Sequence, residues 1–169
     1  MSTDDRDISL NKDRANIIRE FLGLAVSIII TFAVAFWASR YEPGIWYAEL
    51  SKPSWTPPNW AFPVAWTILY FSMSVAAWLV WKQRKTRKIG YPLAFYFIQL
   101  LLNGLWSWIF FGNHLIGMAL VDIVLLLAAI IVTTILFWKQ SRLAGILFVP
   151  YLIWVGFATA LNTGIWLLN

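Results

Sequence analysis

Residues 52–66 read KPSWTPPNWAFPVAW, which places three Trp and four Pro between two apolar runs of the chain. Proline fixes φ and lacks an N–H donor, so the part of this stretch before Trp60 cannot form a regular helix. Each indole has a broad apolar face and a single N–H donor that needs a partner when it is buried. We therefore predict a rigid aromatic segment over residues 40–61, called the lid below, that joins two membrane spans.

The composition is that of a membrane protein. Of the 169 residues, 60% are hydrophobic and 12% are charged, whereas soluble domains carry about 25% charged residues. In lipid, backbone groups must be hydrogen-bonded within the span, which requires helices of roughly 20 residues. The sequence predicts one all-α domain over residues 21–169, an integral membrane bundle of five transmembrane helices. The apolar runs that define the spans are 21–39, 62–81, 91–111, 115–138 and 143–168.

The charges predict an orientation. Of the 13 Lys and Arg residues, only Arg40 and Lys52 fall on the side of the membrane that carries the lid. The positive-inside rule then places the N-terminus in the cytoplasm and the lid outside. The basic run 82–88 is interpreted as a topology anchor in preference to a nucleic-acid patch, so we expect no nucleic-acid partner. The polar residues 1–20 predict a largely disordered arm.

Conventional catalytic groups are missing from the sequence. There is no Cys and only one His, which excludes thiolate chemistry and a multi-histidine metal centre. We find no nucleophile–base pair, carboxylate dyad or phosphate loop, so hydrolysis and phosphoryl transfer have no carriers. His114 lies in a short turn, where a lone His is usually solvated. We therefore expect no metal site and no required cofactor, and enzymatic activity stays open.

Helical spacing places several distinctive side chains on interior faces. Gln99, Asn103 and Trp106 share a face of the third span, and unpaired amides are too costly to face lipid. Phe62 and Trp66 share a face of the second span. In the fifth span, Trp154, Ala158 and Leu161 share one face. Side chains in the outward half of their spans are expected to converge beneath the lid; they are Trp66, Asn103, Trp106, Met118 and Trp154.

Two further features of the spans carry expectations. Gly156, Ala160 and Gly164 form a row of small residues that favours close helix packing and leaves the Trp154 face free to line a cavity. Asp122 is the one carboxylate inside a span, where a central Asp costs about 2.5–3.5 kcal/mol. It is either a proton or ligand site or a hydrogen-bonded tie between helices.

Four blocks of sequence carry a family resemblance. Besides the lid and the start of the second span, they are residues 99–112, 119–122 and 150–162, which read QLLLNGLWSWIFFG, ALVD and PYLIWVGFATALN. In this order, over residues 45–168, they resemble the tryptophan-rich sensory protein/translocator protein (TspO) family. The resemblance implies a membrane receptor or sensor for porphyrins of the protoporphyrin IX type and similar planar hydrophobic ligands. In bacterial members it also implies light-dependent oxidative porphyrin breakdown.

The resemblance assigns roles to particular residues. Trp66, Asn103 and Trp154 match the family's pocket, Ala158 and Leu161 match further pocket positions, and Trp55 and Trp60 match its lid. Trp66 and Trp154 are the expected photo-redox residues. Propionates of a porphyrin are expected near Arg40 and Lys52. The candidate ligand-binding residues are Trp55, Trp60, Phe62, Trp66, Asn103, Trp106, Met118, Asp122, Trp154, Ala158 and Leu161.

The departures from the family pattern favour a bacterial member in the inner membrane. Residues 161–169 lack the Tyr and following basic residue of the eukaryotic sterol motif, so sterol recognition of that type is not expected. Met118 stands where some members have a pocket Trp. A homodimer is expected, with the third span at its interface by resemblance. Two alternatives remain open: a transporter of small amphipathic molecules that uses Asp122, and a non-catalytic regulator of tetrapyrrole or stress responses.

Overall fold

The computed structural model describes the backbone of residues 3–169 and the side chains of residue 14 and residues 16–169. Its long helices are α1 (Thr3–Ala38), α3 (Ala61–Lys82), α4 (Gly90–Ser107), α5 (Ile116–Gln140) and α6 (Arg142–Leu168). The shorter elements are α2 (Ile45–Glu49), the 3₁₀ turn η1 (Gln83–Lys85) and the π-helical turn η2 (Trp108–Gly112). Within the described residues, five helices are long and apolar enough to cross a membrane. The prediction of an all-α membrane bundle is confirmed.

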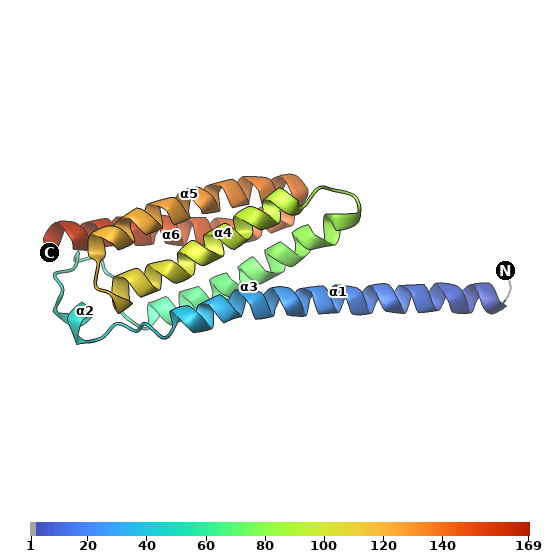
Figure 1. Ribbon diagram of the computed structural model, residues 1–169, viewed down its shortest axis with the longest axis horizontal. Coiled ribbons are helices and arrows are strands. Elements are labelled where there is room, and N and C mark those ends of the chain that lie inside the picture. The colour runs from blue at the N-terminus through green and yellow to red at the C-terminus, as the bar shows by residue number, and fades with distance from the viewer. Residues whose placement is uncertain (1–2) are drawn as a thin grey trace.

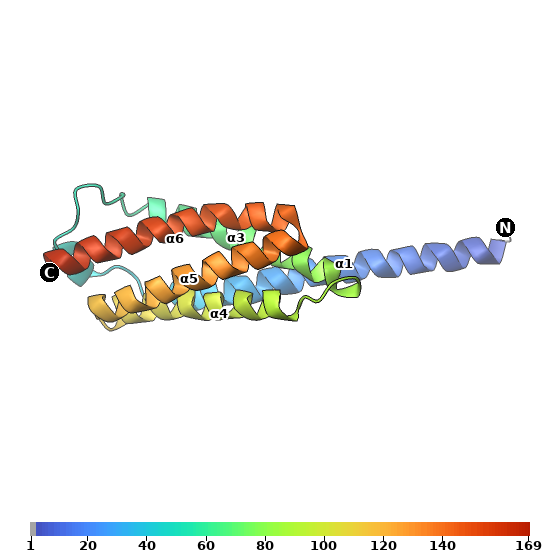
Figure 2. The same ribbon diagram turned by 90° about the horizontal axis from the view of Figure 1, so that it is seen from above.

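The helix ends lie close to the predicted span limits, with one difference at the N-terminus. The sequence predicts a largely disordered arm over residues 1–20, whereas α1 continues back to Thr3. A helix that has already been nucleated by a membrane span extends without a further nucleation cost, so polar residues can follow it out of the membrane. In Figures 1 and 2 this part of α1 projects beyond the bundle at the end opposite the lid.

The helices form a closed ring in which α1 packs on α3, α3 on α6, α6 on α5, α5 on α4, and α4 on α1. Large side chains from four of them fill the centre, including the fully buried Met73, Phe137, Phe148 and Tyr151. Since lipid is as apolar as these side chains, close packing and hydrogen bonds between helices hold such a bundle together. The lid and the C-terminus meet at one end of the ring (Figure 2).

Pro150 lies inside α6, where its ring and missing N–H disturb the helix hydrogen bonds. Ser72 Oγ of α3 donates a hydrogen bond of 2.7 Å to the Leu147 carbonyl, in the turn before Pro150. This bond ties α6 to α3 next to the proline, and contacts with neighbouring helices make proline tolerable in membrane helices.

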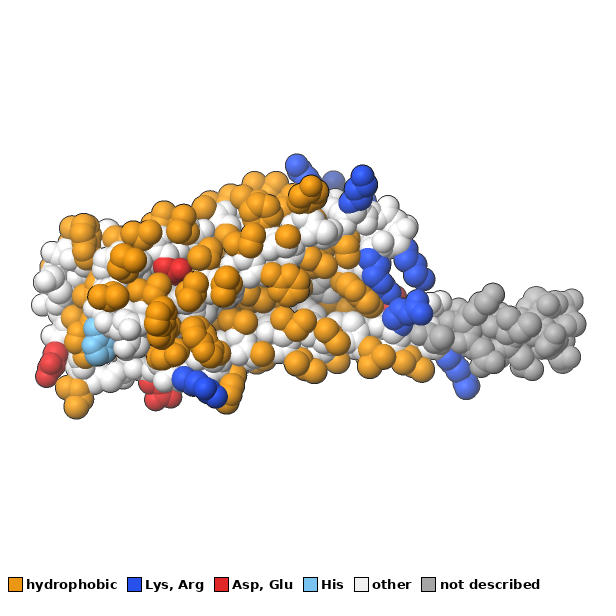
Figure 3. All heavy atoms as spheres, in the orientation of Figure 1, with side chains coloured by type: hydrophobic (Ala, Val, Ile, Leu, Met, Phe, Trp, Pro, Cys, Tyr) orange, Lys and Arg blue, Asp and Glu red, His pale blue; other side chains and the backbone are white. Residues whose placement is uncertain are grey.

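Positive side chains gather at the end of the bundle from which the N-terminal part of α1 projects (Figure 3). The sides of the bundle carry mainly hydrophobic side chains, among them Ile68, Val121 and Ile153, each more than half exposed. This distribution fits a belt of lipid contact with a basic rim on one side.

Candidate functional site

The lid contains a short helix, α2, which the proline-rich sequence did not predict. Its last carbonyl groups have no partner within the helix, and one ammonium group satisfies them. Lys52 Nζ donates to the carbonyls of Tyr47, Ala48 and Leu50 at 2.6, 3.1 and 2.9 Å. The donors of Lys52 are thus engaged in the lid, and the expectation that it lies near a propionate stays a prediction.

Aromatic contacts fix α2 on the bundle. Trp46 stacks on His114 with ring centroids 4.1 Å apart, and it meets Phe110 edge to face at 5.6 Å. His114 has a positive φ of 59°, so it forms a tight turn between η2 and α5. The buried Tyr47 packs on Phe110 and Phe111, and burial raises the pKa of its hydroxyl. His114 thus supports the lid.

The rest of the lid is docked on α6. The Ser51 amide donates to Asn169 Oδ1 at 3.1 Å, and Asn169 Nδ2 donates back to the Ser51 carbonyl at 2.9 Å. A Cβ added at Gly164 would lie 2.6 Å from Pro53 Cγ, whereas one added at Gly156 would meet nothing within 4 Å. The predicted helix-packing row is therefore wrong within the protomer. Gly164 makes room for the lid, and Gly156 faces open space.

This contrast predicts opposite effects for the same substitution on one helix. Gly164→Ala should lower the free energy of unfolding by on the order of 1 kcal/mol, because the rigid Pro53 ring must move. Gly156→Ala should be neutral or stabilising by up to about 1 kcal/mol, since alanine is the better helix former. Thermal unfolding of the two purified variants in one detergent measures both. Equal shifts in the same direction would contradict the docking contact.

An aromatic cluster lies under the lid between α3 and α6. Trp154 meets Phe62 edge to face at 5.9 Å and Phe157 at 5.8 Å, and Phe157 meets the lid residue Trp55 at 5.5 Å. Trp66, one turn further along α3 from Phe62, lies 5.5 Å from Tyr70 and 6.1 Å from Tyr151. We call Trp55, Phe62, Trp66, Trp154 and Phe157 the aromatic site.

A buried hydrogen-bonded network lies beside the aromatic site. Asn103 of α4 accepts a hydrogen bond from the Tyr70 hydroxyl and donates from Nδ2 to the Tyr151 hydroxyl at 3.2 Å. The Tyr151 hydroxyl in turn donates to Gln99 Oε1 at 2.9 Å. Three helices are joined here, and both polar atoms of the Asn103 amide are used. Asn103 is thus a tie between helices that shapes the site from behind.

Two of the predicted site residues have a buried polar atom without a hydrogen-bond partner among the described residues. These atoms are the indole Nε1 of Trp154 and the carboxylate Oδ2 of Asp122. A buried donor or acceptor left unpaired costs free energy unless another group satisfies it. The interpretation of Asp122 as a hydrogen-bonded helix tie is not supported at Oδ2. An unpaired indole donor in the aromatic site is instead suited to a ligand acceptor.

Trp106 and Leu161 belong to a second cluster, nearer α2. The Trp106 ring stacks on Phe110 at 5.0 Å, and its Nε1 donates to Asn162 Oδ1 at 3.0 Å. Leu161 is buried in the same cluster. Because the polar atom of Trp106 is already paired, this residue supports the lid and the turn after α4, and its predicted part in a ligand pocket is not evident in the structure.

Three other predicted residues differ in their surroundings. Met118 is 59% exposed on α5, so its predicted place beneath the lid is not evident, and Trp60 is 69% exposed in the lid. Sequence spacing places a side chain on a face but does not say which neighbour that face meets. Ala158, one turn after Trp154, does pack against the central core.

The structure also adds residues that the sequence did not single out. Tyr70 and Tyr151 complete the network, Phe157 links Trp154 to the lid, and Asn162 pairs with Trp106. A signal for one of them is present: Tyr70 follows Trp66 by four residues and therefore shares its face. Among the residues that the structure describes, no group of three or more His, Asp or Glu side chains is placed to hold a metal ion.

Five spanning helices, a proline-rich lid and a cluster of indoles beneath it define a small multi-pass membrane protein with an aromatic site. The sequence comparisons agree. The model of the TspO/MBR family matches residues 22–167, so the chain belongs to this family.

Several relatives are similar over most of their length. Protein CrtK of Rhodobacter capsulatus is 45% identical over 130 residues, which are 76% of this chain and 81% of the relative. The human translocator protein is 45% identical over 136 residues, covering 78% and 80%. The tryptophan-rich sensory protein of Cereibacter sphaeroides is 41% identical over 141 residues, covering 80% and 87%.

Proposed function

We propose that this membrane protein is a sensor that binds porphyrins, or similar planar hydrophobic molecules, in the aromatic site. The observation that carries the proposal is the pair of indoles on adjacent helices, Trp66 and Trp154, of which Trp154 has a buried N–H without a partner. A planar conjugated ligand gains stacking on the indole faces and burial of about 25 cal/mol per Å² of apolar surface. The unpaired N–H supplies one directional contact.

Binding of a ligand requires the lid to move outward from the aromatic site. Trp55 is 49% exposed and contacts the Phe157 ring at the outer side of the site, so outward movement of this pair would open it. The polar network behind Trp66 stays fixed, because its members are hydrogen-bonded across three helices. Arg40, exposed on the lid side, is the cation left for a propionate once Lys52 is engaged.

Light-driven chemistry follows from the same arrangement. An oxidisable indole held against the excited porphyrin would lend it one electron and regain that electron afterwards. Dissolved dioxygen would be the oxidant, and its two oxygen atoms would end on the two carbons of the porphyrin bond that is cleaved. The chain's own contribution is to hold an oxidisable indole against the ligand.

A porphyrin titration of the purified protein, in the dark and under light, tests the proposal. We expect saturable binding in the dark, seen as quenching of Trp fluorescence and a shifted porphyrin absorbance. Under light with oxygen the bound absorbance should fade, and it should persist when oxygen is removed. If the absorbance faded at the same rate without the protein, the proposed photochemical activity would be wrong. If binding did not saturate, the proposed porphyrin sensor would be wrong.

The unpaired Asp122 carboxylate favours one alternative function, the transport of small amphipathic molecules coupled to protons. Uptake into proteoliposomes driven by a pH gradient and lost in Asp122→Asn would support it. A non-catalytic regulator of tetrapyrrole or stress responses remains if neither porphyrin binding nor flux is found.

We also propose a homodimer.

We further propose that the protein lies in a bacterial inner membrane with its N-terminus in the cytoplasm. The gathering of cations at the end opposite the lid supports this orientation (Figure 3). A C-terminal reporter active only in the cytoplasm should be silent, and one active only outside should give signal. Strong cytoplasmic activity from an intact fusion would reverse the orientation.

A further inference from the structure

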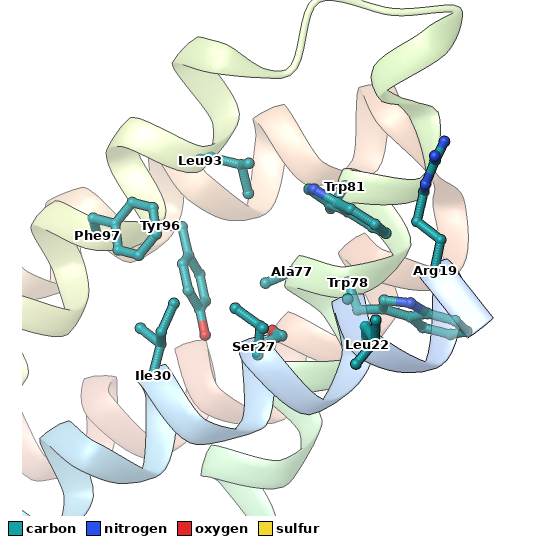
Figure 4. A pocket seen from close by; sticks show the side chains of 12 residues that line it. Arg19, Leu22, Ser27, Ile30, Ala77, Trp78, Trp81, Leu93, Tyr96 and Phe97 are labelled. Carbon is teal, nitrogen blue, oxygen red and sulfur yellow. The ribbon is translucent and has the colours of Figure 1, made fainter. Parts of the chain in front are cut away.

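A groove with a volume of about 270 Å³ lies between α1, α3 and α4 near the basic end of the bundle. Figure 4 shows Ile30 and Phe97 at one end of the groove and Arg19 with the indoles of Trp78 and Trp81 at the other. The lining is otherwise apolar. It comprises Leu22, Gly23, Val26, Ala77, Leu93 and Tyr96, together with Ser27.

Close contact between α1 and α3 shapes the groove. The Trp81 ring lies where a side chain at position 23 would stand, since a Cβ added at Gly23 would be 2.3 Å from it. The two hydroxyl groups that line the groove are already paired: Ser27 Oγ donates to the Ser74 carbonyl at 2.8 Å, and the Tyr96 and Thr31 hydroxyls lie 2.5 Å apart. A slot with an apolar lining inside a membrane suits a hydrocarbon chain.

A second, polar hollow of about 230 Å³ shares Arg19 with the groove. It is lined by four cations and one carboxylate, with Asn16 beside them; the charged residues are Arg19, Glu20, Lys82, Arg84 and Lys85. Glu20 pairs with Lys82 at 2.9 Å. The hollow therefore has an excess of positive charge at the mouth of an apolar slot. This arrangement is complementary to a phospholipid, whose anionic headgroup would meet the cations and whose acyl chain would meet the slot.

We propose that this two-part groove is a binding site for an anionic phospholipid of the cytoplasmic leaflet. One acyl chain lies in the slot between α1, α3 and α4, and the phosphate lies among Arg19, Arg84 and Lys85. The Arg84 guanidinium stacks on Trp81 at 3.4 Å and bonds its carbonyl, so the headgroup and chain parts share one wall. The proposal does not depend on porphyrin binding, because the slot lies at the opposite end of α3 from the lid.

Charge complementarity decides between anionic and neutral lipids. A cation near the surface strengthens the binding of an acidic lipid about fivefold, so two of them should contribute roughly tenfold to thirtyfold. A neutral phospholipid with identical chains can place a chain in the slot, but its affinity lacks the contribution of the two cations.

Native mass spectrometry of the purified full chain in detergent tests the proposal. The probes are phosphatidylglycerol and phosphatidylcholine with the same acyl chains, and glycerol phosphate as the free headgroup. Arg19→Gln combined with Lys85→Gln removes two exposed cations from the hollow. Arg142→Gln combined with Lys139→Gln is the matched control, with the same change of charge on the same side of the membrane.

A second variant tests the slot. Val26→Trp fills it from α1, and Val124→Trp is its control, because both valines are about half exposed and α5 does not line the groove. We expect one tightly retained phosphatidylglycerol per protomer, weakened roughly tenfold to thirtyfold in the charge variant. It should be displaced in Val26→Trp, and both controls should bind as the wild type does.

Equal retention of the two phospholipids would overturn the proposal, as would equal effects of either variant and its control. Displacement of the lipid by millimolar glycerol phosphate alone would show a phosphate site and also overturn it. Porphyrin titration of the same variants separates the two proposals, because the loss of lipid binding should leave porphyrin binding unchanged.

Discussion

Trp66→Phe and Trp154→Phe are each expected to reduce light-dependent porphyrin loss to a small fraction of the wild-type rate while weakening dark binding less than the leucine variants do. Phenylalanine keeps an aromatic face for stacking, but it lacks the indole's easier oxidation and its N–H donor. Leucine at either position removes stacking as well, and should weaken dark binding by roughly two- to tenfold. The measurement is the decay of bound-porphyrin absorbance under fixed illumination, beside a dark titration.

Trp138→Phe is the matched control, because Trp138 lies 46% exposed toward the basic end of α5, away from the aromatic site. It should behave as the wild type in both measurements. If Trp66→Phe and Trp154→Phe bound porphyrin normally and still degraded it at the wild-type rate, the redox role of these residues would be wrong. The transporter and regulator alternatives would then take precedence.

Asn103→Leu is expected to lower the free energy of unfolding by about 1–3 kcal/mol, because two interhelical hydrogen bonds are lost and each contributes roughly 0.6–1.7 kcal/mol in a membrane. The Tyr70 hydroxyl loses its acceptor, and the Tyr151 hydroxyl keeps only Gln99. Denaturant unfolding of the purified protein in mixed micelles measures the change. A double-mutant cycle with Tyr70→Phe isolates the energy of that one contact.

Thr133→Val is the control for Asn103→Leu. Thr133 is equally buried, but its hydroxyl bonds a carbonyl of its own helix at 2.7 Å, so no tie between helices is lost. A comparable loss of stability in both variants would contradict the role of Asn103 as a tie. Normal stability of Asn103→Leu together with a large loss of porphyrin binding would instead make it a direct ligand contact.

The membrane spans were predictable because lipid imposes a rule that acts on short stretches of sequence. A run of apolar residues long enough to cross the hydrocarbon must be a helix, whatever its neighbours are. Even Pro150 and the glycines of α6 did not change this. The arm before the first span lies outside that rule, and there the prediction of disorder differs from the helix that begins at Thr3.

The candidate site was predictable only in part. The face that Phe62, Trp66 and Trp154 present follows from helical spacing. The structure brings Phe62 and Trp154 into edge-to-face contact and packs Trp66 and Trp154 against the same core. Met118 was expected beneath the lid from its place in the outward half of its span, and it is nevertheless exposed. Periodicity gives the direction of a side chain relative to its own helix, and the order of helices around the ring determines what it meets.

By itself, the sequence determined the five helices, their apolar faces, the asymmetry of charge and the family to which the chain belongs. Tertiary structure decided which distant groups meet: Trp106 pairs with Asn162, Gly164 admits Pro53, and Asn103 joins three helices. The physical reason is distance along the chain. Lipid and helix geometry act on neighbouring residues, whereas these contacts join segments that meet only when the whole ring has closed.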